Sequence, residues 1–199
     1  MKTVIFDMYG VIIKDPEGGL MPFVNSVFPD LTPDDVYYPH WVKACVGELS
    51  SLDFFRNIGF DGDLSKIEKE YLDTIEIDES FYEIIPIIRK YYRLALLSND
   101  VSEWSRYLRD KFKINHFFDV VIVSGDAKIK KPDTQIFNAM LGKLGQPASD
   151  CIYVDDRRKN LVSAQWLGMD TILFNSRNVP YDGKAVNNFG ELINMLINS

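Results

Sequence analysis

Apolar and polar positions follow two different patterns along the chain. Runs of consecutive β-forming apolar residues occur at 4–6, 93–97, 120–124, 151–155 and 171–174, and polar residues follow each run. Uninterrupted runs of this kind are typical of strands that are buried on both faces of a parallel sheet. The pattern therefore predicts five buried strands.

Between these runs, apolar residues recur every three or four positions, which indicates helices. We expect helices at 81–92, around 104–112, at 134–144, around 161–167 and at 189–197, with Gly145 ending the third of them. Pro86 should either kink the first helix or mark its true start. Alternation of strands and helices predicts an α/β fold with a doubly wound, mostly parallel, five-stranded Rossmann-like sheet.

Residues 15–80 interrupt this alternation, because they contain helical periodicity and no convincing strand. Helix starts are indicated at Thr32, Ser50 and Asp63. We therefore predict an α/β core domain formed by residues 1–14 and 81–199, with 15–80 inserted as a small α-helical cap. Most aromatic residues of the insertion should form its core, with a minority lining the face toward Asp7.

Composition limits the classes of function. The chain has 199 residues, of which 46% are hydrophobic and 26% charged, enough for one domain with a modest insertion. A net charge of -7 and a pI of about 4.9 leave no basic stripe, so we expect no nucleic-acid partner. We find no membrane-spanning run and no signal-peptide pattern, so we expect a cytoplasmic protein. The two cysteines, Cys45 and Cys151, are isolated and should be reduced core residues.

Polar residues with chemical potential stand where the predicted strands end. Asp7 ends the first strand, Ser98 and Asn99 the second, and the pair of carboxylates at 155–156 the fourth, while Lys131 follows the third. The carboxyl ends of parallel strands share one edge, which is where ligands of open α/β sheets bind. Carboxylates suit a divalent cation, and lysine, hydroxyl and amide groups suit a phosphoryl anion.

These motifs together resemble the haloacid dehalogenase-like hydrolase superfamily. The matching motifs are Asp7 in Phe-Asp-Met-Tyr-Gly-Val, Ser98 in Leu-Leu-Ser-Asn, Lys131 in Lys-Lys-Pro-Asp, and Asp155 with Asp156 in Tyr-Val-Asp-Asp. The insertion lies between the first two motifs, where that superfamily places a helical cap. The resemblance covers essentially the whole chain.

The resemblance implies that Asp7 is a nucleophile that takes up the transferred group as a covalent aspartyl intermediate. Lys131 would offset the negative charge and hold Asp7 in place, while also contacting the substrate. Ser98 and the backbone N–H of Asn99 would bind the phosphoryl oxygens of a small-molecule substrate.

The same resemblance implies a Mg²⁺ cofactor. The ion would be held by the Asp7 side chain, the backbone carbonyl of Tyr9 and Asp156. Asp155 would contact these ligands and not the ion itself, or it would bind the ion through a water molecule. A metal and a lysine are needed because a phosphate dianion otherwise repels the attacking carboxylate.

One residue departs from the phosphatase pattern. Two positions after the nucleophile, phosphatases of the superfamily usually carry a second Asp as the general acid–base, and this chain has Tyr9, which would also contact the substrate. A phenol with a reference pKa of about 10 is a poor base at neutral pH. We therefore expect slow phosphomonoester hydrolysis, with Asp100, Asp133 or Glu48 as possible substitutes.

Two alternatives remain open from the sequence. Asp-x-Tyr-Gly is also the first motif of 2-haloacid dehalogenases, whose displacement of halide needs no proton. However, Val11 replaces their usual Thr, and the 155–156 carboxylate pair replaces their small hydroxyl residues. A non-catalytic phosphate- or metabolite-binding protein is the third interpretation.

Overall fold

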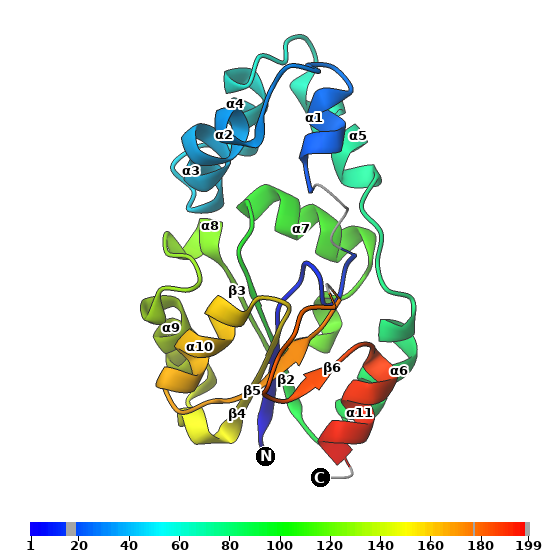
Figure 1. Ribbon diagram of the computed structural model, residues 1–199, viewed down its shortest axis with the longest axis vertical. Helices are drawn as coiled ribbons and strands as arrows, with labels where there is room; N and C mark the ends of the chain where they lie inside the picture. The colour runs from blue at the N-terminus through cyan, green and yellow to red at the C-terminus, as the bar shows by residue number, and fades with distance from the viewer. Residues whose placement is uncertain (15–18, 177, 198–199) are drawn as a thin grey trace.

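The protein is built around one six-stranded parallel sheet, seen in a computed structural model that describes residues 1–14, 19–176 and 178–197 (Figure 1). The strand order is β3-β2-β1-β4-β5-β6, and every neighbouring pair is parallel. This confirms the predicted α/β fold. The strands are β1 Thr3–Phe6, β2 Arg93–Ser98, β3 Val120–Val123, β4 Cys151–Asp155, β5 Asp170–Phe174 and β6 Ala185–Val186. The sequence did not predict β6, because two residues are too few to show a periodicity.

Strand β1 lies inside the sheet, paired with β2 on one side and β4 on the other. Its residues Val4, Ile5 and Phe6 are completely buried. Since successive side chains of a strand point to opposite faces, Val4 and Phe6 belong to one hydrophobic cluster and Ile5 to another. The sheet is thus covered on both faces, and Asp7 is the first polar side chain after the buried run.

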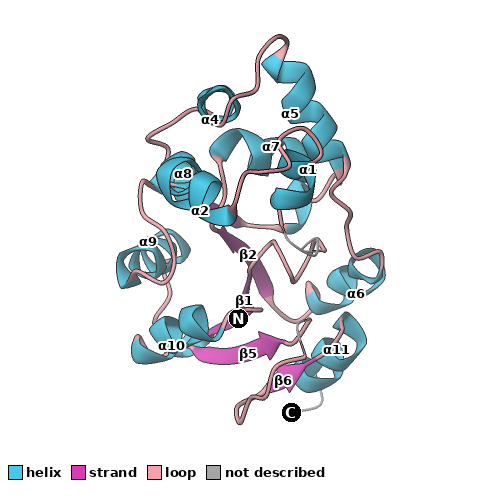
Figure 2. Ribbon diagram, turned by 45° about the horizontal axis from the view of Figure 1, so that its top comes forward, coloured by secondary structure: helices cyan, strands magenta, loops and turns pink. Residues whose placement is uncertain are grey.

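Helices cover the two faces of the sheet (Figures 1 and 2). Helices α6 Ser80–Ile88, α7 Ser102–Lys111 and α11 Phe189–Ile197 pack into the cluster that contains Phe6. Helices α9 Thr134–Leu144 and α10 Arg158–Trp166 pack into the cluster that contains Ile5. Helix α8 is Ser124–Ala127, and short 3₁₀ turns span Asn115–Phe117 and Ala148–Asp150. None of the described helices is both long and apolar enough to cross a bilayer.

Helix α6 differs from its predicted bounds. Pro86 lies inside the helix and does not mark its start, and the helix ends at Ile88 and not at residue 92. The Asp78 carboxylate accepts a hydrogen bond of 3.0 Å from the N–H of Ser80, which helps to set the helix start well before the proline. Gly145 adopts a φ of 64° and ends α9, as predicted.

Residues between β1 and α6 form a group of short helices that lies above the carboxyl edge of the sheet (Figure 1). Thr32, Ser50 and Asp63 are the residues that precede α2, α4 and α5, and the Ser50 and Asp63 side chains cap their helices. The elements are α1 Met21–Asn25, α2 Pro33–Val36, the π-helical turn η1 Tyr37–Trp41, α3 Val42–Cys45, α4 Ser51–Asn57 and α5 Leu64–Asp73. The cap boundaries stay a prediction, and residues 15–18 at the first boundary lie outside the described residues.

The helical group contacts α8 through Cys45 and Gly47, and we call this contact the joint. The Ser124 hydroxyl donates to the Cys45 carbonyl at 2.6 Å, and Lys128 Nζ donates to the Gly47 carbonyl at 2.7 Å. Gly47 has a φ of +66°, and a Cβ there would lie 2.3 Å from the Gly125 carbonyl oxygen. Cys45 is a free, buried thiol, and burial raises its pKa to about 11. Glycine is therefore required at position 47 both for its backbone conformation and for the close contact.

Gly47→Ala should lower the free energy of unfolding by more than the about 1–2 kcal/mol that a left-handed alanine costs, because it also separates the joint. Gly62→Ala is the matched control, since Gly62 has a φ of +77° and a Cβ added there would meet no atom within 4 Å. Urea unfolding of both variants measures the difference. Equal losses would show that the contact with Gly125 contributes nothing.

Candidate active site

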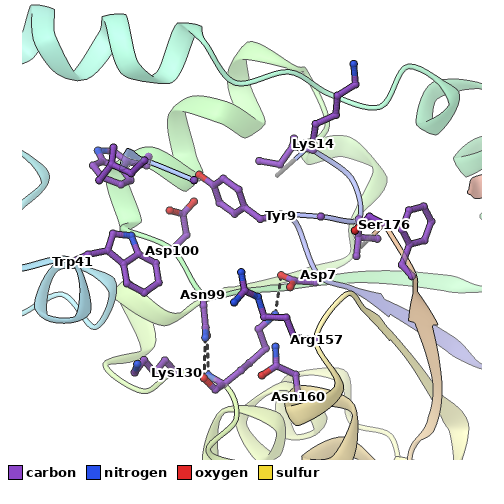
Figure 3. Close-up of a pocket in the computed structure, with 18 of the residues that line it drawn as sticks. Asp7, Tyr9, Lys14, Trp41, Asn99, Asp100, Lys130, Arg157, Asn160 and Ser176 are labelled. Atoms are coloured by element: carbon purple, nitrogen blue, oxygen red, sulfur yellow. Dashed lines mark hydrogen bonds and ion pairs between the residues drawn. The ribbon is translucent and has the colours of Figure 1, made fainter. Parts of the chain in front are cut away.

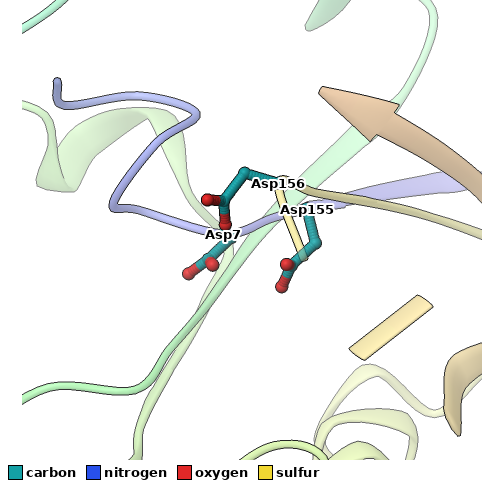
Figure 4. Close-up of side chains that lie close together, drawn as sticks. All are labelled: Asp7, Asp155 and Asp156. Atoms are coloured by element: carbon teal, nitrogen blue, oxygen red, sulfur yellow. The ribbon is translucent and has the colours of Figure 1, made fainter. Parts of the chain in front are cut away.

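The structure brings the predicted polar groups together at the carboxyl edge of the sheet; Figure 3 shows Asp7 and Asn99, and Figure 4 shows Asp7 with Asp155 and Asp156. Asp7 follows β1, Asp155 ends β4 and is followed by Asp156, and Lys131 lies in the segment between α8 and α9. All four residues are buried, with exposed fractions of 6% or less. Three carboxylates and one ammonium therefore share a site that is largely closed to water.

The Lys131 ammonium is held by three oxygens. Nζ lies 2.7 Å from Asp7 Oδ1 and 3.0 Å from Asp155 Oδ2, and it donates to the Leu97 carbonyl at 2.9 Å. These contacts use all three donors of the ammonium. Burial acts to lower the pKa of Lys131, but the charges of Asp155 and Asp7 raise this pKa above its ordinary value. The lysine is thus fixed as a cation beside the predicted nucleophile.

The two oxygens of Asp7 have different surroundings. Oδ1 receives both Lys131 Nζ and the backbone N–H of Met8, each at 2.7 Å. Within the described part of the chain, no hydrogen bond to Oδ2 is found. Burial raises the pKa of Asp7 well above its ordinary value; Lys131 opposes this, and the other two carboxylates add to it. Oδ2 is therefore the oxygen that remains for a ligand.

Asp155 is the most heavily hydrogen-bonded carboxylate of the site. It accepts from Lys131, from the Tyr153 hydroxyl, from Asn160 Nδ2 at 2.9 Å and from the Arg157 N–H at 2.7 Å. Burial acts to raise its pKa, but Lys131 and the hydroxyl and amide donors hold the pKa of Asp155 below its ordinary value. The Asp155 carboxylate therefore binds the Lys131 ammonium and fixes its position.

Asp156 completes a group of three carboxylates (Figure 4). One oxygen from each of Asp7, Asp155 and Asp156 lies within 4.8 Å of the others. Oxygens on opposite sides of an octahedral Mg²⁺ ion are roughly 4 Å apart, so the group fits a hard divalent cation after small adjustments. Gly10, with a φ of +75°, permits this approach, since a Cβ there would lie 2.8 Å from Asp156 Cγ.

Ser98 and Asn99 follow one another at the end of β2. The Ser98 hydroxyl is buried and has no hydrogen-bond partner among the residues that the structure describes. A buried polar group without a partner is costly, so an external acceptor there is favoured. The Asn99 side chain exchanges two hydrogen bonds with the backbone of Lys131, at 2.7 and 2.9 Å. Its amide thus positions the lysine, whereas the sequence suggested a role only for its backbone N–H.

Tyr9 extends toward Asp100 (Figure 3), and both residues line the same cavity as Asp7. Burial raises the pKa of Asp100 well above its ordinary value, while the hydrogen bond from the Val101 N–H and the nearby Tyr9 hydroxyl act in the opposite direction. Nothing in the sequence connects these two residues. The Tyr9 phenol therefore lies near the Asp100 carboxylate, which comes from the loop after β2. A phosphatase of the superfamily would usually have a carboxylate at position 9 itself.

The other two predicted substitutes for a general acid–base do not line this cavity. Asp133 is exposed and caps α9 through the Gln135 N–H at 2.9 Å. Glu48 is exposed beside the joint with α8. Of the three candidates, only Asp100 lies at the site.

The cavity has a volume of about 1050 Å³ and extends from Asp7 to the helical group. Four cationic side chains line it in a chain of net charge -7: Lys14, Lys130, Arg157 and Lys159, in addition to the buried Lys131. Sequence reasoning missed this arrangement because the four residues come from three separate segments, with Arg157 and Lys159 together at the start of α10. Their clustering favours an anionic ligand.

Comparison with known proteins places the chain in a family. The family model of the haloacid dehalogenase-like hydrolases matches residues 4–174. The chain therefore belongs to the haloacid dehalogenase-like hydrolases, as its motifs indicated. It is similar to a flavin mononucleotide hydrolase of Arabidopsis thaliana, with 24% identity over 87% of this chain and 72% of that protein.

Two solved structures share the fold. A haloacid dehalogenase-family enzyme of Bacteroides thetaiotaomicron, in complex with magnesium and inorganic phosphate, has a TM-score of 0.76 and 22% identity, covering 87% of this chain and 93% of the other. A 2-haloacid dehalogenase of Pseudomonas syringae has a TM-score of 0.72 and 17% identity, covering 100% and 98%. Both branches of the superfamily thus resemble this chain in fold.

Asp155→Asn should lower the free energy of unfolding by about 3 kcal/mol, because it removes one partner of a buried ion pair and places an amide donor among donors. Asp156→Asn should change it by less than about 1 kcal/mol without metal, since it removes one of three mutually repelling charges, and the ion pair that it loses, with the exposed Arg157 at 3.7 Å, is long and accessible to water. Urea unfolding in the presence of EDTA compares the two isosteric variants.

The two variants should affect metal affinity in the opposite order, with the larger loss in Asp156→Asn. Asp156→Asn should weaken Mg²⁺ binding at least about tenfold in titration calorimetry, as expected for loss of a ligand. Equal effects of both variants on stability, or unchanged Mg²⁺ affinity in Asp156→Asn, would contradict the different roles given to these neighbours.

Proposed function

We propose that this protein is a Mg²⁺-dependent hydrolase of small phosphomonoesters that uses Asp7 as its nucleophile. The observation that carries the proposal is the asymmetry of the Asp7 carboxylate. Lys131 and the Met8 N–H bind Oδ1 at 2.7 Å, which fixes the side chain and leaves Oδ2 to attack phosphorus. Attack forms a bond from Oδ2 to phosphorus and breaks the ester bond, and the released alkoxide takes a proton from the general acid or from water. Water then attacks phosphorus and gives its proton to the general base, the Oδ2–phosphorus bond breaks, and inorganic phosphate is released from the restored Asp7 carboxylate.

The donor set also suits the proposed metal. Asp7, Asp156 and the backbone carbonyl of Tyr9 would hold Mg²⁺. Asp155 would instead bind Lys131 and hold it in place. When bound, the ion offsets the charge of the carboxylates and polarises the phosphoryl group. The related Bacteroides enzyme that was solved with magnesium and phosphate supports this choice of cofactor.

The remaining polar groups have complementary tasks. The buried Ser98 hydroxyl, which has no partner among the described residues, would donate to a phosphoryl oxygen, beside the backbone N–H of Asn99. Lys131 would contact the same group while it holds Asp7. Four further cations along the cavity would draw a phosphorylated substrate toward this site.

The leaving group and the attacking water both require a general acid–base. Tyr9 occupies the position at which the resemblance places a carboxylate, and its side chain extends toward the buried Asp100. A phenol in this role is a weak base at neutral pH. We therefore propose that turnover is slow relative to phosphatases that have the second Asp.

A 2-haloacid dehalogenase activity is the second candidate, favoured by the sequence Asp7-Met8-Tyr9-Gly10. The group of three buried carboxylates opposes it, because Asp155 and Asp156 would repel the carboxylate of a haloacid. Pure binding of a phosphorylated metabolite is the third candidate, and it would require the same anion site without turnover.

A panel of phosphomonoesters and 2-haloacids, assayed with and without Mg²⁺, separates these candidates. We expect slow hydrolysis of phosphomonoesters only, dependent on Mg²⁺ and abolished in Asp7→Asn. Turnover of haloacids without metal would identify a dehalogenase. Absence of turnover in either class, with retained phosphate binding, would indicate a binding protein.

Tyr9→Asp should raise kcat/KM for phosphomonoesters at least tenfold, a cautious fraction of the typical general acid–base contribution of about 10²–10⁴. Tyr9→Phe is the control, because it removes the hydroxyl without adding a carboxylate. A dehalogenase should instead lose activity in Tyr9→Asp. A wild type that is already fast, with no gain in the variant, would show that Tyr9 does not limit turnover.

A further inference from the structure

The wall of the cavity that faces the helical group is aromatic. Tyr37 and Trp41 come from η1, Tyr71 from α5 and Trp104 from α7, and all four line the cavity that also contains Asp7. On the side formed by the sheet, the lining includes the charged and amide residues Asp7, Lys131 and Asn99, together with Phe174 at the end of β5. The cavity therefore has a polar end, where a phosphoryl group would bind, and an aromatic end.

The aromatic side chains differ in how deeply they are buried and in how many contacts they make within the protein core. Tyr71 and Trp104 are buried and in mutual contact, with ring centroids 5.1 Å apart, and the Trp104 indole N–H donates to Glu68 at 2.8 Å. Trp41 is only half-buried. Among the described residues its one ring contact is an edge contact with Tyr37, at 6.0 Å.

Trp41 lines the same cavity as Asp7, Asn99 and Asp100. In the view of Figure 3 its indole lies on the opposite side of Asp100 from Tyr9. No hydrogen bond of its indole N–H occurs in the part of the chain that the structure describes. The turn that carries it is π-helical, a local irregularity that is frequent at functional sites. A broad aromatic face thus remains available at the cavity.

The size of the cavity limits the substrate further. Ligand pockets are typically about 300–1,000 Å³, and the volume here, about 1050 Å³, lies at the upper end. A phosphorylated three-carbon compound would leave most of this space filled with water. It would also leave Trp41 without a ligand contact.

We propose that the substrate is a phosphomonoester with a flat aromatic ring system, of the size of a nucleotide or flavin, whose ring stacks on Trp41 while its phosphate binds at Asp7. This proposal rests on the proposed function for the phosphate end only. Stacking on an aromatic side chain accepts any planar ring, so Trp41 selects for a class of substrate and not for one compound. Trp41 is accordingly a specificity residue and takes no part in bond breaking.

The test compares two flat substrates, adenosine 5′-monophosphate and flavin mononucleotide, with glycerol 3-phosphate. Trp41→Leu should lower kcat/KM for the flat substrates at least about tenfold more than for glycerol 3-phosphate, mainly through KM, the scale expected for one lost stacking contact. Trp41→Phe should retain most of the preference. Tyr38→Leu is the matched control, since Tyr38 lies on the same turn, is 76% exposed and does not line the cavity.

A binding measurement keeps the two proposals separate. Titration calorimetry with the Asp7→Asn variant should give weaker binding of adenosine 5′-monophosphate after Trp41→Leu and unchanged binding after Tyr38→Leu. An equal loss for flat and small substrates, an equal effect of Tyr38→Leu, or a wild-type preference for glycerol 3-phosphate would overturn the stacking proposal. If no phosphomonoester is hydrolysed but Trp41 still determines binding of the flat ligands, the proposed function fails and the aromatic site stands.

Discussion

Three carboxylates buried around one ammonium dominate the structure of this protein. Lys131 offsets Asp7 and Asp155 through contacts of 2.7 and 3.0 Å. Arg157 Nε lies 3.7 Å from Asp156, so three carboxylates face two cations and one negative charge is left in excess. Removing such charges from water is expensive unless they are paired and hydrogen-bonded. The parallel strands supply the rigid positions, and Gly10 lets Asp156 approach. A divalent cation and a phosphoryl group that accepts from Ser98 would together satisfy what the protein leaves unbalanced.

The surroundings of Tyr9 distinguish this chain from an ordinary phosphatase site. Its side chain extends toward Asp100, which is buried and has a pKa raised well above its ordinary value. In the proposed function, a phenol beside a buried carboxylate thus stands at the general acid–base position. Beyond it, Trp41 presents an aromatic surface within the same cavity. Slow chemistry combined with selective binding of flat phosphorylated compounds is the behaviour that this arrangement favours.

Much of the site could be predicted from the sequence because parallel strands place their carboxyl ends on one edge. A run of buried residues before Asp7, and another before Asp156, therefore predicted their proximity, and a shared family motif added Lys131. The contact between Tyr9 and Asp100 could not be predicted, since it depends on side-chain direction in two loops. Strand β6 was missed because two residues show no periodicity. The sequence predicted that some aromatic residues of the insertion would face Asp7, but not which ones, because core and ligand-facing aromatics have the same sequence pattern.

Chemical trapping of the covalent intermediate tests the central claim most directly. The protein would be mixed with a phosphomonoester and Mg²⁺, quenched and reduced with borohydride, which converts an aspartyl phosphate to homoserine. Trypsin should release residues 3–14, a peptide in which Asp7 is the only carboxylate side chain. Mass spectrometry should find homoserine at position 7, and no such product without substrate or in Asp7→Asn. Turnover of the phosphomonoester with an unmodified residue 7, or with the reduced residue elsewhere in the chain, would contradict the account.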